Sequence, residues 1–217
     1  MTTKVKTLSS LCFAGFLLIS SCNYPERTIK PNINNEFPTT IQLQLTNQGN
    51  PADVLTATWE QLLDANGVPL PPDISQAHLA FKKNSVYTAK IFILDKTKDP
   101  VDDITLEIEE RSNVHLLFYQ PLPASGALII PFTSGDQYPV PIPTPLPAGL
   151  PLNLNITITD QDTHSPPLPL GLETLFVSGD AGTGWLQIVL RHQPESKNGT
   201  YAPGSTDVDV GFTVVIQ

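Results

Sequence analysis

From Thr40 onwards, apolar and polar residues alternate along several stretches of the chain. Side chains of a β-strand point to opposite faces in turn, so a period of two indicates a strand with one buried and one solvent-facing side. Four stretches show this pattern clearly: Ile41–Leu45, Leu55–Trp59, Leu152–Ile158 and Val208–Ile216. Asp207 and Asp209 fall on the polar face of the last one. The pattern predicts antiparallel strands that share one core.

Other stretches carry a weaker or a different strand signal. Val86–Leu94 and Trp185–Leu190 are apolar on both faces, which is typical of strands in the centre of a sheet. The weaker strand candidates are Ala77–Phe81, Val114–Tyr119, Ala127–Phe132 and Leu172–Val177.

One segment, Val101–Arg111, fits either a strand or one face of a helix. Asp102 and Asp103 at its start and Arg111 at its end suit the helix dipole, so we favour a short helix. The chain is therefore predicted to be all-β, an antiparallel, immunoglobulin-like β-sandwich with one short helix.

Proline content bears on the domain organisation. The chain contains 22 prolines, which argues against a helical protein. They are densest in Tyr138–Pro151, which we interpret as an extended polyproline-like connection or a protected edge. Each side of this stretch carries few strand candidates for an independent sandwich. We favour one β-sandwich domain over residues 39–217, and two small halves split at residues 138–151 are the alternative.

The N-terminus has the anatomy of an export signal. Lys4 and Lys6 precede an apolar run, Leu11–Ile19, which is too short to span a bilayer. The run ends in Ile-Ser-Ser-Cys at Cys22, which resembles the lipobox of bacterial lipoproteins. We therefore predict a signal peptide over residues 1–21, lipidation of Cys22, and a tether over residues 22–38.

The cysteine count and the charge limit the chemistry of the mature chain. Cys22 would be its sole cysteine, which excludes disulfides and thiolate metal sites. Loss of Lys4 and Lys6 leaves 10 basic against 21 acidic side chains, a net charge near −11. Such a chain is repelled by phosphate backbones, so nucleic acid is an improbable partner. The membrane partner would be reached through the lipid on Cys22.

The sequence offers few groups for chemistry at a site. It contains no GxSxG, HExxH or P-loop motif, and we predict no catalytic residues and no resident cofactor. Asp160, Asp162 and His164 follow a strand at alternate positions, which makes them candidate ligands of a divalent metal. A polar loop is the alternative interpretation.

Two further groups of polar residues also allow two interpretations each. Arg191 and His192 end a strand candidate and are candidate contacts of an anionic ligand; a solvated strand end is the alternative. Glu107, Glu109 and Glu110 precede His115. They favour a solvated acidic face over acid–base chemistry.

Three stretches of the chain also resemble a known group of proteins. Thr56–Glu60 (TATWE), Val86–Glu110 (VYTAKIFILDKTKDPVDDITLEIEE) and Gly184–Val210 (GWLQIVLRHQPESKNGTYAPGSTDVDV), together with the lipobox, are similar to small secreted lipoproteins of the Bacteroidetes type. The resemblance carries no biochemical activity over to this chain. Some members bear the label of a type 1 periplasmic-binding fold, which implies an α/β sheet, but the short connections here depart from it. Some members are similar in setting to the accessory lipoproteins found beside TonB-dependent receptors, and this analogy implies an outer-membrane receptor as a partner.

Localisation and function follow as hypotheses. Asn23 after Cys22 resembles an outer-membrane address, and both the periplasmic face and the cell surface stay open. Our first hypothesis is a non-enzymatic binding or accessory module of the cell envelope. The alternatives are a metal-dependent hydrolase-like enzyme using Asp160, Asp162 and His164, and a purely structural envelope protein.

Overall fold

The computed structural model describes residues 37–131 and 149–217. Cys22, the signal peptide and residues 132–148 of the proline-rich region lie outside the described residues. The described elements follow one another as β1 (Thr40–Asn47), β2 (Val54–Glu60), β3 (His78–Phe81), β4 (Ser85–Asp95), β5 (Asp102–Asp103), α1 (Ile104–Glu110), the 3₁₀ helix η1 (Ser112–Val114), β6 (His115–Leu122), β7 (Leu154–Ile158), β8 (Glu173–Ser178), β9 (Gly182–His192) and β10 (Ser205–Ile216).

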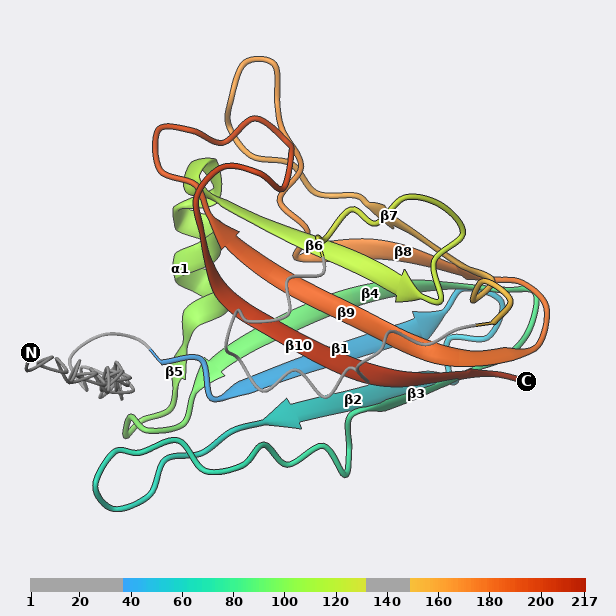
Figure 1. Ribbon diagram of the computed structural model, residues 1–217, viewed down its shortest axis with the longest axis horizontal. Coiled ribbons are helices and arrows are strands. Elements are labelled where there is room, and N and C mark those ends of the chain that lie inside the picture. Colours follow the sequence, from blue (N-terminus) through green and yellow to red (C-terminus); the bar gives the residue numbers. More distant parts are fainter. Residues whose placement is uncertain (1–36, 132–148) are drawn as a thin grey trace, which may run out of the picture.

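The strands form two sheets that pack on each other (Figure 1). One sheet has the order β2-β1-β4-β8-β7, with the short β5 paired to β4, and the other has the order β3-β10-β9-β6. Neighbouring strands are antiparallel except for β3 and β10, which are parallel. Each sheet contains strands from both sides of the proline-rich region, so both parts of the chain build one sandwich. The predicted all-β sandwich is confirmed.

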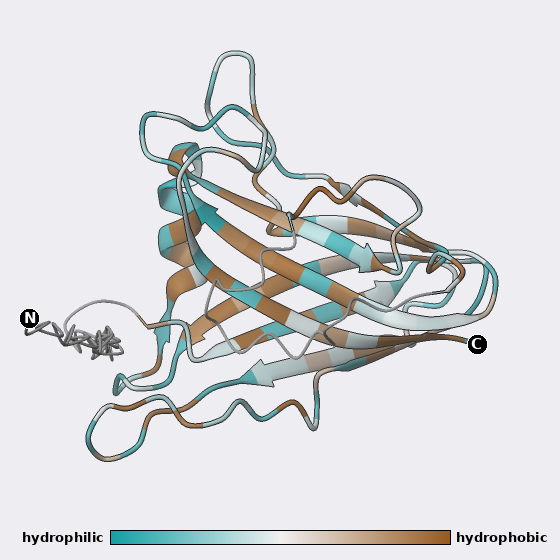
Figure 2. Ribbon diagram, in the orientation of Figure 1, coloured by the Kyte–Doolittle hydropathy of each residue, from teal (hydrophilic) through white to brown (hydrophobic). Residues whose placement is uncertain are grey.

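Alternation along the strands builds the core. Ile41, Leu43 and Leu45 of β1 are fully buried, and Val210 and Phe212 of β10 meet them in one hydrophobic cluster that both sheets share. Figure 2 shows the resulting change between hydrophobic and hydrophilic residues along the strands. Burial of apolar surface from two sheets is the main stabilising contribution in a described region that contains no cysteine.

The two stretches that are apolar on both faces lie in the middle of their sheets, as predicted. β4 lies between β1 and β8, and β9 lies between β10 and β6. The outer face of β9 is buried because a second cluster covers it, in which Val189 packs with Phe118 and Ile130. Tyr201 packs against the same cluster.

The ambiguous segment forms the short helix α1. Asp103 is the N-cap, and its carboxylate accepts a hydrogen bond from Thr105 N (3.0 Å), which satisfies one of the unpaired amides of the first turn. Ile104 and Ile108 are buried in the main core. Helix α1 therefore covers one end of the sandwich, the end where the described chain begins (Figure 1). Within residues 37–131 and 149–217, no helix has the length and hydropathy needed to cross a membrane.

One strand prediction was wrong in its described part. Residues 127–131 of the candidate Ala127–Phe132 form no strand. Instead, Ile129 N donates to the side-chain Oε1 of Gln120 (2.7 Å), and the side chain of Ile130 covers the outer face of β6 and β9. This segment therefore covers the outer face of the sheet. The hydrophobic pattern alone does not distinguish a covering segment from a strand.

Candidate functional site

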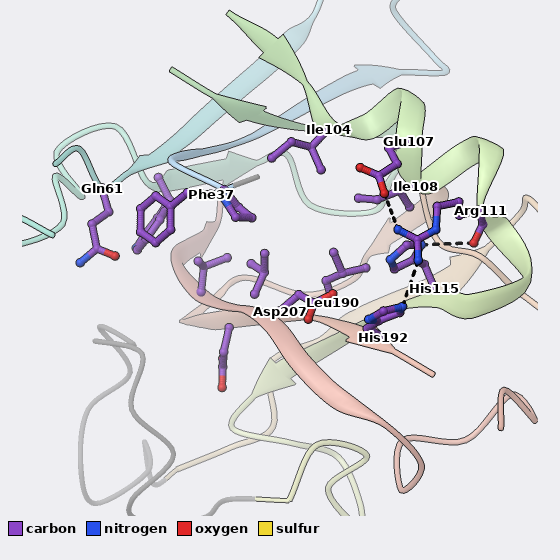
Figure 3. Close-up of a pocket in the computed structure, with 15 residues that line it drawn as sticks. Phe37, Gln61, Ile104, Glu107, Ile108, Arg111, His115, Leu190, His192 and Asp207 are labelled. Atoms are coloured by element: carbon purple, nitrogen blue, oxygen red, sulfur yellow. Dashed lines mark hydrogen bonds and ion pairs between the residues drawn. The ribbon is translucent and has the colours of Figure 1, made fainter. Parts of the chain in front are cut away.

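A cavity of about 480 Å³ opens between the sheets at the end that α1 covers. Figure 3 shows the side chains that line it. Its apolar wall comes from both sheets and α1. Arg111, His115 and His192 gather beside the C-terminal end of α1, whereas Gln61 lies on the opposite side of the cavity. The lining residues are Phe37, Pro38, Trp59, Gln61, Ile104, Glu107, Ile108, Arg111, His115, Leu190, His192, Asp207, Val208, Asp209 and Val210. A hollow with an apolar wall and a few convergent polar groups is typical of a small-molecule site.

Strand pairing brings two histidines of this cavity together. His115 begins β6 and His192 ends β9, and the two are direct partners across these strands. Their rings are stacked, with centroids 4.9 Å apart and planes inclined by 21°. The register of two antiparallel strands thus places these residues side by side, although they are 77 positions apart in the chain.

A third polar group, Asp207, reaches the cavity through an irregularity in β10. Thr206 pairs with Arg191 and Val208 pairs with Leu190, so Asp207 is an extra residue opposite β9. Such a β-bulge changes the direction in which a side chain points. Asp207 therefore lines the cavity together with its neighbour Val208, although simple alternation places it on the outer face.

Hydrogen bonds to Arg111 determine which ring nitrogen carries the proton in each histidine. His115 Nδ1 lies 3.2 Å from the carbonyl oxygen of Arg111, which can only accept, so Nδ1 is the donor. His192 Nε2 lies 3.4 Å from Arg111 Nη2, which can only donate, so His192 Nε2 is the acceptor. The Arg111 guanidinium also forms an ion pair with Glu107, one helical turn earlier.

The surroundings shift two titratable groups of the cavity. Burial, together with the neighbouring His192 and Arg111, lowers the pKa of His115 to about 4, although its hydrogen bond to the Arg111 carbonyl acts the other way. Burial raises the pKa of Asp207, and the charges of His192 and the nearby arginines partly offset this rise. At neutral pH His115 is therefore an uncharged imidazole.

The apolar side of the cavity contains a hydrogen-bond donor that no described residue satisfies. Trp59 is 3% exposed, and its indole Nε1 has no hydrogen-bond partner among the described residues. A buried tryptophan N–H usually has a partner.

The three residues predicted as metal ligands occupy another part of the molecule. The carboxylate of Asp160 accepts hydrogen bonds from the amides of Gly171 and Leu172, both at 2.8 Å. These bonds join the loop after β7 to the start of β8. Asp160 therefore has a clear structural role.

Asp162 and His164 contact each other, as alternate positions in a loop can do. Asp162 is buried and accepts hydrogen bonds from the amides of His164 and Leu168. Its other oxygen lies 2.8 Å from His164 Nδ1 and 2.8 Å from the ammonium of Lys197. Burial raises the pKa of Asp162, but these hydrogen bonds together hold it well below its usual range. These contacts satisfy both carboxylates without a metal ion.

Arg191 and His192, predicted together as ligand contacts, point to opposite faces of β9. The guanidinium of Arg191 donates to Thr206 Oγ1 (2.7 Å) and to the carbonyl of Gly204 (2.6 Å), and it lies over the ring of Tyr201. It is thus a structural residue of the outer face. His192 does line the cavity, which agrees with a role in binding.

Sequence reasoning missed most of the polar groups of this cavity. Glu107, Arg111 and His115 are spaced four residues apart, which places them along one side of α1 and its extension. That spacing could have indicated a common site. Glu109 and Glu110 are exposed and form the solvated face that the sequence predicted for the whole acidic run.

His115, His192 and Asp207 also form a set of metal-ligand types. One side-chain ligand atom from each lies within 4.8 Å of the others, and no other group of three such residues within 37–131 and 149–217 meets this distance.

In comparisons with known proteins, no family model, no curated protein and no solved structure matches the chain. A function for the protein therefore has to be inferred from the geometry of the cavity.

Proposed function

We propose that the protein is a lipid-anchored, non-enzymatic binding module of the bacterial cell envelope that takes a small ligand into the cavity between its sheets. The strongest support for this proposal is the cavity itself. It combines an apolar wall with convergent polar groups, and these are the features that bind and orient a small molecule.

The proposed anchor precedes in the sequence a residue that lines the cavity. Phe37, the first described residue, lines the cavity, and its amide is hydrogen-bonded to Asp95 (3.1 Å). The proposed lipid on Cys22 precedes it by residues 23–36, a length that reaches roughly 50 Å at most when extended. A ligand would thus be captured within that reach of the membrane that holds the protein.

The side chains of the cavity support binding more than covalent chemistry. Its described lining contains no Ser, Thr, Cys, Lys or Tyr, the residue types that most often act as nucleophiles. Arg111 is held by Glu107 and His192. The ion pair with Glu107 thus orients the guanidinium of Arg111, as expected of a preorganised binding group.

Membrane fractionation tests the anchor. We expect the wild-type protein to incorporate radiolabelled fatty acid and to fractionate with the outer membrane. The Cys22→Ser variant should incorporate none and be released, and Thr28→Ser, which lies outside the lipobox, is the matched control. Fatty acid in the Cys22→Ser variant would contradict lipidation at this residue.

A fluorescent probe tests the cavity. Anilinonaphthalene sulfonate combines an aromatic body for the apolar wall with an anion for Arg111, and we expect the mature lipidated protein in detergent to bind it. Phe37→Ala and Arg111→Ala should each weaken binding about tenfold, an effect near 1.4 kcal/mol. Lys83→Ala is the control. The backbone N–H of Lys83 donates a hydrogen bond to the carbonyl of Gln217, and this C-terminal residue lies at the end of the sandwich opposite α1 (Figure 1). Equal affinities in all variants would contradict the assigned site.

A further inference from the structure

We infer that His115, His192 and Asp207 bind a divalent transition-metal ion, with Zn²⁺ as the test case. The inference deepens the proposed function and rests on it, because it names a ligand class for the same cavity. The composition of the group supports it, since two imidazoles and one carboxylate are a common ligand set for Zn²⁺ and for other first-row metals.

The state of the two rings also favours a metal. A ligating imidazole usually donates its other N–H to a carbonyl or carboxylate, which fixes its orientation. His115 does this through Nδ1 to the Arg111 carbonyl, so its Nε2 keeps a lone pair. His192 also presents a lone pair at Nε2, where it now accepts only a long contact of 3.4 Å from Arg111.

The three side chains lie close to the spacing that a metal requires. Their ligand atoms are within 4.8 Å of one another, whereas atoms bound to one tetrahedral Zn²⁺ are about 3.3 Å apart. Binding of an ion would require side-chain rotations that bring these atoms closer together. The bulge that turns Asp207 toward the cavity is a feature that recurs beside functional sites.

The charges around the site favour a cation. The positive charge of Arg111 is matched by its ion pair with Glu107. Asp207 places a carboxylate beside the two imidazoles. A bound ion would replace the contact between Arg111 and His192 and leave the pair of Arg111 with Glu107 in place.

The test is a Zn²⁺ titration of the chelator-treated, mature lipidated protein in detergent, followed by calorimetry. We expect one ion per chain. His192→Ala and Asp207→Asn should each weaken binding by more than about 100-fold, since even loss of groups behind the ligands costs 10–100-fold. His164→Ala is the matched control, because that histidine belongs to the predicted site around Asp162. Loss of Zn²⁺ binding in His164→Ala alone would overturn the assignment.

Co²⁺ provides a readout that depends on no variant. The paramagnetic ion should shift the ring signals of His115 and His192 in NMR spectra and leave those of His78 and His164 in place. Absence of binding, or shifts of the other two rings, would overturn the inference. If the protein binds the fluorescent probe but no metal, the metal site is contradicted and the proposed function is still supported. If it binds neither the probe nor a metal, both the metal site and the proposed function are contradicted.

Discussion

His115 and His192 face each other from neighbouring strands, with their rings stacked at a centroid distance of 4.9 Å. His115 is 6% exposed. Burial and the neighbouring ring both disfavour a charge on it, so its pKa falls to about 4. The pair therefore holds at least one neutral imidazole at the wall of the cavity at neutral pH.

The low pKa of His115 makes stability depend on pH. An unfolded histidine binds a proton near pH 6.5, whereas folded His115 does so only near pH 4. As the pH falls from 6.5 to 4, His115 binds a proton in the unfolded state but remains unprotonated in the folded state. The free energy of unfolding should therefore drop by about 3 kcal/mol over this range. Urea unfolding at several pH values measures it.

The variant His115→Gln isolates this contribution from those of other groups. It should lose stability less steeply than the wild type between pH 6.5 and 4. His78→Gln, which removes an exposed histidine, should retain the wild-type slope. Identical slopes in all three proteins would show that His115 titrates normally in the folded state.

The buried ion pair of Asp162 and Lys197 gives a second prediction. Both side chains are inaccessible to solvent and lie 2.8 Å apart, and Lys197 also donates to the carbonyl of Ser112 (2.8 Å). Asp162→Asn leaves a buried ammonium without its counter-charge, which should lower the free energy of unfolding by about 3–5 kcal/mol. Urea unfolding at pH 7 measures the loss.

The control for this prediction is an exposed pair. Lys90 and Glu173 lie 2.6 Å apart with both side chains more than half exposed, and Lys90→Met should cost less than about 1 kcal/mol. A stable Asp162→Asn protein that has lost a bound metal would instead favour the metal site predicted from the sequence.

Neighbouring residues of β9 should respond to substitution in opposite ways. Arg191→Met removes the hydrogen bonds to Thr206 and Gly204 and should lower stability by about 2–4 kcal/mol, with unchanged affinity for anilinonaphthalene sulfonate. His192→Ala should change the affinity and leave stability within about 1 kcal/mol. If the Arg191→Met variant binds the probe more weakly under conditions in which it is fully folded, the prediction that Arg191 contacts the ligand is supported.

The helix cap gives a prediction with a built-in control. Asp103→Ala removes the hydrogen bond to Thr105 N and should cost about 1 kcal/mol. Asp102→Ala, at the exposed preceding position, should stay within about 0.5 kcal/mol. Thermal unfolding of the two variants compares them directly. Equal effects would mean that charge at the helix start matters and the cap geometry does not.

Most of the strands could be predicted from the sequence because hydrophobic alternation reports directly on a sheet with one buried face. The short helix could also be predicted, since Asp103 and Arg111 mark its ends. The segment Ala127–Phe132 could not be predicted correctly. Its apolar residues cover the outer face of a sheet, and a covering segment has no required period.

The site was harder to predict than the fold. The pairing of His115 with His192 depends on strand register, and Asp207 enters the cavity through a bulge that alternation does not reveal. Asp160 and Asp162 were predicted as metal ligands because their carboxylates stand at alternate positions after a strand. In the structure these carboxylates bind backbone amides of their own loop, a role that the pattern of residue types does not separate from metal binding.

The most direct test of the binding site is an NMR spectrum of the histidine rings, recorded during titration of the mature protein with anilinonaphthalene sulfonate. The chain has four histidines, of which His115 and His192 line the cavity while His78 and His164 do not. We predict that the ring signals of His115 and His192 shift together and saturate, and that the other two stay in place. Saturable shifts of His78 or His164, with His115 and His192 unchanged, would contradict the assignment of this cavity as the binding site.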